Sequence, residues 1–247
     1  MILLCAAALA AHPSDLREPL SHGVVINWTE GVVEVEAGSY RAGAQATKAV
    51  EQSARLAIDE RIVDGVGDVP VTAERSVTEL MEVEALGAPL RSRRSRWRVV
   101  EAVYAASGKV DLHAELSLQE FLKPYALAIA SPTPPTPRDG DFTGVLIDAR
   151  GTGVRPVYSP TIASVDGQPL WSGELYDEDA VSVAPCRWVP DPSHSVAALA
   201  GDAPLMLRAE GGGKGRVVLG AAEAGRLRGV LDTTVLGRGR VVVVVDP

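Results

Sequence analysis

Cysteine and aromatic residues are both scarce in this sequence. The 247 residues include only two cysteines, Cys5 and Cys186, and aromatic side chains make up 4% of the chain. Cys5 lies in an apolar N-terminal segment that we expect to be cleaved, which leaves one thiol and excludes an intramolecular disulfide. With so few aromatic residues, we expect cores of alanine, valine and leucine that are stabilised by packing alone.

The chain also lacks an excess of positive charge. Its 24 lysines and arginines are outnumbered by 32 aspartates and glutamates, which gives a formal net charge of -8 and a pI of about 5.1. This balance offers no overall attraction to nucleic acid or to anionic membranes. The 46% hydrophobic and 23% charged residues are typical of a globular protein, and the length suits two small domains or one large one.

Motifs for nucleotide, metal or hydrolytic chemistry are missing. The glycines at 211–215 lack the Gly-Lys-Ser/Thr of a P-loop, and no paired cysteines, HExxH or GxSxG occur. The cation of Arg187 would favour a reactive thiolate at Cys186, but free cysteines are usually buried and inert. We therefore predict no catalytic, cofactor-binding or metal-binding residue, and a thiol enzyme centred on Cys186 is the weakest hypothesis.

Residues 2–11 form a short apolar run that is followed by His12-Pro13. Its length suits the core of a signal peptide and is too short to span a bilayer. We predict a signal peptide over residues 1–11 and a periplasmic or exported protein. An uncleaved hydrophobic tail is the alternative. Lipidation of Cys5, with outer-membrane association, would require a start site upstream of Met1.

Residues 22–123 are predicted to form an α+β module. Apolar alternation predicts a hairpin over 24–37, and alanines at helical spacing predict a helix over 42–63. Ser76 and Glu79 have the spacing of a capping box, which would begin a short second helix.

A strand pair over 97–118 is predicted to complete this module. Its alternation directs His113 to solvent, where a lone histidine is usually inert. The preceding run, residues 91–98, holds five arginines in eight residues. It is either an anion-binding patch or, as such runs usually are, a solvated loop or strand edge.

The pattern of small and apolar residues in this module resembles a known family. Residues 31–38, 42–71 and 104–118, the last ending in GKVDLHAELSL, are similar to the lipoprotein-20 family and to the N-terminal domain of flagellar assembly protein T. The resemblance implies an envelope location and an α+β module that serves assembly rather than catalysis. The sequence departs from these families in lacking a lipobox.

A proline-rich linker over 124–141 is predicted to separate this module from a second one over 142–247. The second module is predicted to be a mixed sheet that ends in a β-α-β unit with a parallel strand pair. Its expected elements are strands at 142–147, 154–158, 161–165 with 170–171, 206, 217–219 and 240–246, a loop at 185–195, and a helix at 221–228. This half resembles a C-terminal region of uncharacterised exported bacterial proteins.

Asp148, Arg150 and Arg155 are the candidate contacts for a partner or ligand. Asp148 ends a predicted buried strand, and strand ends in open sheets are where ligands tend to dock. The alternative is that Asp148 and Arg150 pair with each other or brace the glycines at 151 and 153.

Together these patterns predict an α+β protein of two small modules, the first with a strand pair, an alanine-rich helix and a second antiparallel strand pair. The leading hypothesis is a non-enzymatic exported envelope protein with an assembly or interaction role, serving a surface structure or the flagellum. Its expected partner is another envelope protein, with no nucleic acid, no cofactor and no membrane-spanning segment. The alternative is a module that binds a small anionic envelope ligand through Arg150, Arg155 or the arginine run.

Overall fold

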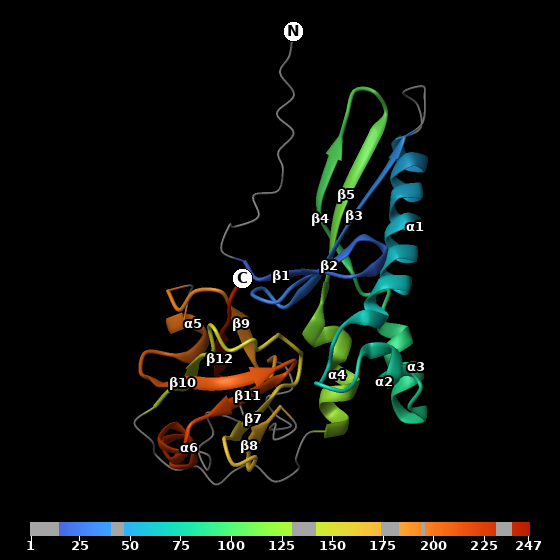
Figure 1. The fold of residues 1–247 in the computed structure, drawn as a ribbon. Coiled ribbons are helices and arrows are strands. Elements are labelled where there is room, and N and C mark those ends of the chain that lie inside the picture. The colour runs from blue at the N-terminus through green and yellow to red at the C-terminus, as the bar shows by residue number, and fades with distance from the viewer. Residues whose placement is uncertain (1–14, 41–46, 130–141, 174–182, 194–195, 231–238) are drawn as a thin grey trace.

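The computed structural model of the protein describes residues 15–40, 47–129, 142–173, 183–193, 196–230 and 239–247. It is an α+β protein with two sheets, one from each half of the chain, and the second sheet is mixed (Figure 1). The predicted fold class is therefore confirmed. The expected signal peptide and residues 130–141 of the expected linker lie outside the described residues.

The secondary structure follows the chain in two groups. The elements of the first half are β1 (Arg17–Pro19), η1 (Ser21–Gly23), β2 (Val24–Asn27), β3 (Val32–Tyr40), α1 (Thr47–Gly65), η2 (Val66–Asp68), α2 (Val77–Met81), α3 (Glu84–Arg93), β4 (Arg98–Tyr104), β5 (Lys109–Ser117) and α4 (Leu118–Ile129). Those of the second half are β6 (Gly144–Asp148), β7 (Thr161–Ser164), β8 (Pro169–Ser172), β9 (Arg187–Val189), α5 (Val196–Ala200), β10 (Pro204–Gly213), β11 (Arg216–Leu219), α6 (Ala221–Arg228) and β12 (Val241–Val244).

The first sheet is antiparallel, with strand order β1-β2-β3-β5-β4. The predicted hairpin forms as β2 and β3, and the predicted strand pair forms as β4 and β5. Val33 and Val35 of β3 are almost completely buried, whereas Glu36 is exposed. This alternation buries one face of the sheet beneath α1.

Helix α1 packs against β3 and β5 through one apolar stripe. The buried side chains of this stripe recur at helical spacing and are Val50, Ala54, Ile58 and Ile62. The helix ends at Gly65, where a side chain would collide with Val24. The predicted capping box is also present, because Ser76 and Glu79 bond reciprocally at the start of α2.

Helix α4 was not anticipated from the sequence. It extends to Ile129, so the residues at 124–129 that were assigned to the linker are helical. Pro124 lies inside the helix, where a proline removes one backbone hydrogen bond and usually kinks or breaks a helix. Phe121 and Leu122 are fully buried, so tertiary packing outweighs the cost of an internal proline.

The second sheet has the order β8-β7-β11-β10-β6-β12-β9. The predicted β7–β8 hairpin and the strands β6, β10 and β12 are present in it. The expected parallel pair of β11 and β12 is wrong, because β10 and β6 lie between these strands. Since β11 is antiparallel to β10, and β10 and β12 are both parallel to β6, β11 and β12 run in opposite directions.

Two further details of the second half differ from expectation. Residues 154–158 form no strand, and Arg155 makes only an isolated bridge to Lys214. The expected loop at 185–195 contains β9, a three-residue strand that pairs with β12. Strand β12 therefore has neighbours on both sides, and Val241–Val244 are buried throughout, as a uniform valine run predicts.

The two halves of the chain are joined by a seam of backbone hydrogen bonds. The N–H groups of Tyr158 and Ser159 donate to the carbonyls of Pro70 and Val71, at 3.0 and 2.7 Å. The Tyr158 ring also makes an edge-on contact with Tyr125 of α4, with centroids 6.4 Å apart. Through these contacts one continuous buried cluster includes residues of both halves.

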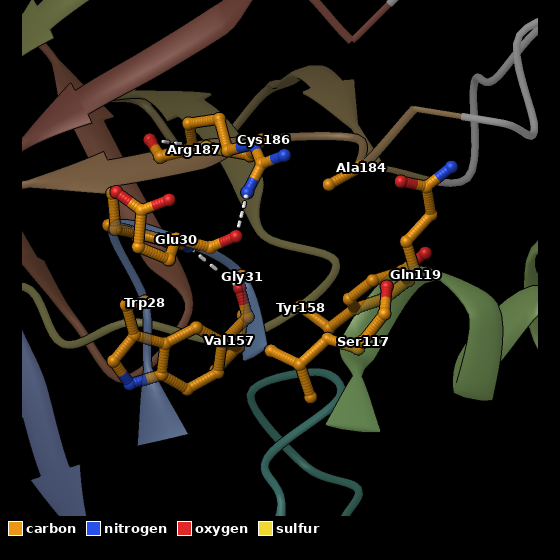
Figure 2. Close-up of a pocket in the computed structure, with 12 residues that line it drawn as sticks. Trp28, Glu30, Gly31, Ser117, Gln119, Val157, Tyr158, Ala184, Cys186 and Arg187 are labelled. Atoms are coloured by element: carbon orange, nitrogen blue, oxygen red, sulfur yellow. Dashed lines mark hydrogen bonds between the residues drawn. The ribbon is translucent and has the colours of Figure 1, made fainter. Parts of the chain in front are cut away.

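A second contact between the halves lies at the turn between β2 and β3. Nη1 of Arg187 donates to the Glu30 carbonyl at 2.9 Å. Beside it, within the second half, Trp188 Nε1 donates to the Val157 carbonyl at 2.8 Å. Figure 2 shows Arg187 reaching over Gly31 to make its bond. The cavity beside these residues holds only about 40 Å³, well below the size of a small-molecule site.

Replacing Gly31 by alanine should weaken this contact. Gly31 has φ +70°, and an added Cβ would collide with the Arg187 guanidinium. We expect Gly31→Ala to lower the free energy of unfolding by about 2–3 kcal/mol. Alanine is disfavoured in the left-handed conformation, and its Cβ would displace the hydrogen bond of Arg187. Urea denaturation of the full chain measures it.

Gly167→Ala is the matched control, because Gly167 has φ +83° but no atom within 4 Å of an added Cβ. This variant should lower the free energy of unfolding by about 1 kcal/mol, because only the left-handed backbone conformation is penalised. Equal losses in the two variants would contradict a role for the Arg187 contact.

Candidate functional site

The candidate site is a group of charged residues at the C-terminal ends of the parallel strands. Asp148 ends β6 and lies opposite Arg208 of β10 in the pairing of these strands. Asp191 and Asp246 follow β9 and β12, whose strands run the same way as β6. With Arg150, these residues form what we call the charged edge, at the end of the sheet where ligands commonly dock.

The predicted pair Asp148 and Arg150 is brought together by a bidentate ion pair. Nε of Arg150 lies 2.9 Å from Oδ1 of Asp148, and Nη2 lies 2.6 Å from Oδ2. The Arg150 backbone N–H also donates to Oδ1, at 3.2 Å. These bonds hold the pKa of Asp148 below its usual range, and Arg208 lowers it further. The alternative interpretation, mutual pairing, is therefore the geometry observed.

The glycine loop after β6 is tied to the end of β12. Gly151 adopts φ +75°, and its N–H donates to Oδ2 of Asp246 at 2.7 Å. The negative charges of Asp148, Asp191 and Asp246 together raise the pKa of Arg150. The loop thus fixes the backbone that carries Arg150.

An open cleft of about 530 Å³ adjoins the charged edge. It is lined by Arg150, Gly151, Thr152, Arg208, Ala209, Glu210 and Glu223. Guanidinium and carboxylate groups therefore face the same space, and Glu223 is itself bound to Arg226 at 2.8 Å. Such a surface can form ion pairs with groups of both signs, which suits a mixed-charge partner better than a small anion.

Arg155, the third candidate, is placed elsewhere. Its backbone N–H donates to the Gly213 carbonyl and its carbonyl accepts from Gly215, which fixes it to the β10–β11 turn. Its side chain is exposed and does not line the cleft. The structure therefore unites Asp148 and Arg150 but does not add Arg155 to them.

Most of the arginine run makes internal contacts. Nη1 of Arg91 donates to the Met81 carbonyl at the end of α2, and Nη1 of Arg94 donates to the Val63 carbonyl in the last turn of α1. Arg93 donates to the Glu120 carbonyl at 2.7 Å. These three guanidinium groups therefore bind helix carbonyls, and Arg91 and Arg94 do so at the negative, C-terminal ends of α2 and α1.

Two residues with reactive side chains are buried. Cys186 is 4% exposed, and burial raises the pKa of its thiol despite the opposing charge of Arg187. The reactive-thiolate hypothesis is therefore wrong and the buried alternative is confirmed. His113 is 6% exposed, so its expected solvent exposure is also wrong. It lies on the polar face of the first sheet, with Nδ1 3.5 Å from Oε1 of Glu36.

Sequence reasoning missed the partners of Asp148 and Arg150 in the charged edge. Arg208 and Glu210 lie in β10, whose direction relative to β6 depends on tertiary pairing. Asp191 follows β9, which is too short to be recognised by periodicity. Asp246 could have been predicted from the sequence. It directly follows an apolar valine run, just as Asp148 directly follows the apolar strand at 142–147.

Comparison with known families gives one match, in the second half. Residues 144–247 match the family model described as Treponema pallidum Tp0624, second domain. This agrees with the predicted resemblance of the C-terminal half to a bacterial protein region, and it includes Asp148 and Arg150. No curated protein matches the chain. None of the described helices combines the length and apolar character needed to cross a membrane.

The Asp148–Arg150 pair should make a small, pH-dependent contribution to stability. Because the folded-state pKa of Asp148 is depressed, this contribution is present at neutral pH and is lost as the pH falls below about 4. The pair is partly exposed, so we expect a coupling energy of about 0.5–1 kcal/mol.

A double-mutant cycle with Asp148→Asn and Arg150→Gln, measured by urea denaturation at neutral and acid pH, gives this coupling. Glu223→Gln with Arg226→Gln, a partly exposed pair of which Glu223 lines the same cleft, is the control for general charge effects. A coupling that persists unchanged under acid conditions would contradict the ion-pair explanation.

Proposed function

We propose that this chain is a non-enzymatic exported envelope protein that acts by assembling with partner proteins. Export is supported by the apolar run at residues 2–11, and an assembly role by the resemblance of the first half to the lipoprotein-20 and flagellar assembly protein T families. A surface structure or the flagellum is the assembly that this resemblance favours.

The observation that carries the proposal is the exposed edge strand β4. It is last in the order of the first sheet, and no described segment pairs with its outer side. Val100, Val103 and Tyr104 are 41%, 44% and 52% exposed. Figure 1 shows that the β4–β5 hairpin extends away from the second sheet.

Edge strands with apolar residues usually need protection, because their unpaired N–H and C=O groups attract other strands. Arg98 and Glu101 are the only charged residues of β4, and the rest of the strand towards Tyr104 has none. An extended partner segment could add to β4 by backbone hydrogen bonds and contact Val103 and Tyr104. The unprotected edge is therefore the surface to which we assign partner binding.

The alternative function, binding of a small anion at the charged edge, is less favoured by the geometry. Arg150 is already held by Asp148, and the carboxylates of Glu210 and Glu223 line the same cleft. An anion entering there would meet like charges and compete with an existing bidentate pair. A protein surface with both signs of charge fits this edge better and could form a second contact with the same partner.

Export is tested by the intact mass of the chain from fractionated native cells. We expect a soluble envelope fraction in which the chain begins near Ala11, because the apolar run is removed at a small-residue site. A full-length chain confined to the cytoplasm would contradict export. Lipid attached to Cys5 would show anchoring and an upstream start.

Partner binding through β4 is tested by photo-crosslinking in the same cells. A photoreactive residue at Val103 should give a discrete protein adduct, whereas the same residue at Val165, 55% exposed on the β7–β8 turn, should not. Val100→Lys, in the chain that carries the photoreactive residue at position 103, should reduce the adduct about tenfold without unfolding the chain, because lysine on an edge strand opposes pairing. Equal crosslinking at Val103 and Val165 would contradict the assignment.

A further inference from the structure

A second cleft lies between the two halves and shares no residue with the charged edge or with β4. Its volume is about 480 Å³, which lies within the range of small-molecule sites. Helices α2, α3 and α4 and the turn before α2 contribute one side, and residues at 159–172 contribute the other. Clefts at the junction of two structural units are common positions for ligand sites.

One side of the cleft is apolar. Leu80 of α2 and Leu86 of α3 are buried, Val83 between these helices is 38% exposed, and Ile129 at the end of α4 is partly buried. Leu80, Leu86 and Ile129 come from three successive helices, and Val83 lies between the first two. Together they offer an apolar surface on which an aliphatic chain can pack.

The polar side chains that line the cleft are five hydroxyls, the Glu74 carboxylate and the Arg75 guanidinium. Ser159 is 3% exposed, and its hydroxyl has no hydrogen-bond partner among the described residues. A buried hydroxyl without a partner is uncommon and calls for a ligand or a water molecule. The Arg75 side chain is exposed and forms no ion pair with a described residue, although its charge lowers the pKa of Glu79.

Ser159 and Arg75 lie on either side of the same residue. The carbonyl of Val71 accepts from the Ser159 N–H at 2.7 Å, and the N–H of Val71 donates to the Arg75 carbonyl at 2.8 Å. The neighbouring acid Glu74 already accepts from the Thr72 hydroxyl, at 3.2 Å. A donor and a cation are therefore available together where the turn before α2 meets the second half.

We propose that this cleft binds an aliphatic carboxylate. The carboxylate accepts from the Ser159 hydroxyl and pairs with the Arg75 guanidinium, and the chain lies along Leu80, Val83, Leu86 and Ile129. A carboxylate supplies an acceptor for Ser159 and a counter-charge for Arg75, neither of which the described residues provide. This site goes beyond the proposed partner binding and does not depend on β4.

The test is titration of decanoate into the full chain by calorimetry, below the micellar concentration. We expect saturable binding of one decanoate per chain. Decanol, which keeps the chain and loses the charge, should bind at least about tenfold more weakly, because a charge-assisted hydrogen bond is lost. Hexanoate should also bind more weakly, because it covers less apolar surface.

Three variants separate the contribution of the carboxylate group of decanoate from that of its aliphatic part. Ser159→Ala and Arg75→Gln should each weaken decanoate binding about tenfold, and Arg75→Gln should leave decanol binding unchanged because decanol carries no charge. Ser159→Ala removes a hydroxyl that has no partner among the described residues, so the fold should persist. Val83→Ser should weaken both ligands. Arg96→Gln, an exposed arginine outside the cleft, is the matched control for net charge.

Absence of saturable decanoate binding to the folded chain would overturn the proposal. Decanol binding as tightly as decanoate, or equal effects of Arg75→Gln and Arg96→Gln, would also overturn it. A peptide with apolar C-terminal residues that displaces decanoate at much lower concentration would reassign the cleft to a protein C-terminus. None of these outcomes bears on crosslinking at β4, so the two proposals fail separately.

Discussion

The arrangement of this molecule depends on the backbone seam between Pro70-Val71 and Tyr158-Ser159. Val71, Tyr158 and Ser159 are buried, so their backbone groups need partners within the protein. The second half supplies the N–H donors and the first half supplies the carbonyl acceptors. These bonds hold the second half against the segment that leads into α2. The continuous core, the small cavity at Gly31 and the larger cleft near Ser159 all follow from this docking.

Several charged side chains form hydrogen bonds or ion pairs within the protein. These side chains are therefore less available to bind a ligand or a partner. Arg91, Arg93 and Arg94 bond to carbonyls of three helices, and Arg150 is held by Asp148. A run of arginines in a sequence therefore does not by itself mark an anion site. The surfaces that remain for recognition are the apolar edge of β4, the mixed charges beside β10 and the cleft near Arg75. All three suit binding, and assembly is the role that the sequence resemblance favours.

The parts of the fold that were predicted share a local cause. The β2–β3 and β4–β5 hairpins alternate with period two, α1 carries its alanines at helical spacing, and Ser76 and Glu79 cap α2 through contacts three residues apart. The missed parts depend on distant residues. Helix α4 contains Pro124 and is held by burial of Phe121 and Leu122, and β9 exists because β12 offers it an edge. The candidate site divides in the same way, since Asp148 and Arg150 lie close in sequence while Arg208, Asp191 and Asp246 come from other strands.

The sequence alone determined the α+β class, the hairpins, the long helix and the burial of the valine strand, because periodicity and turn chemistry act over a few residues. It also supplied the resemblance of the second half that the family match supports. Tertiary structure decided the strand order, the antiparallel relation of β11 and β12, and the burial of Cys186 and His113. It also decided which charges meet at the sheet edge and which backbone groups bond at the seam. These depend on which surfaces pack together, and no short-range pattern specifies that choice.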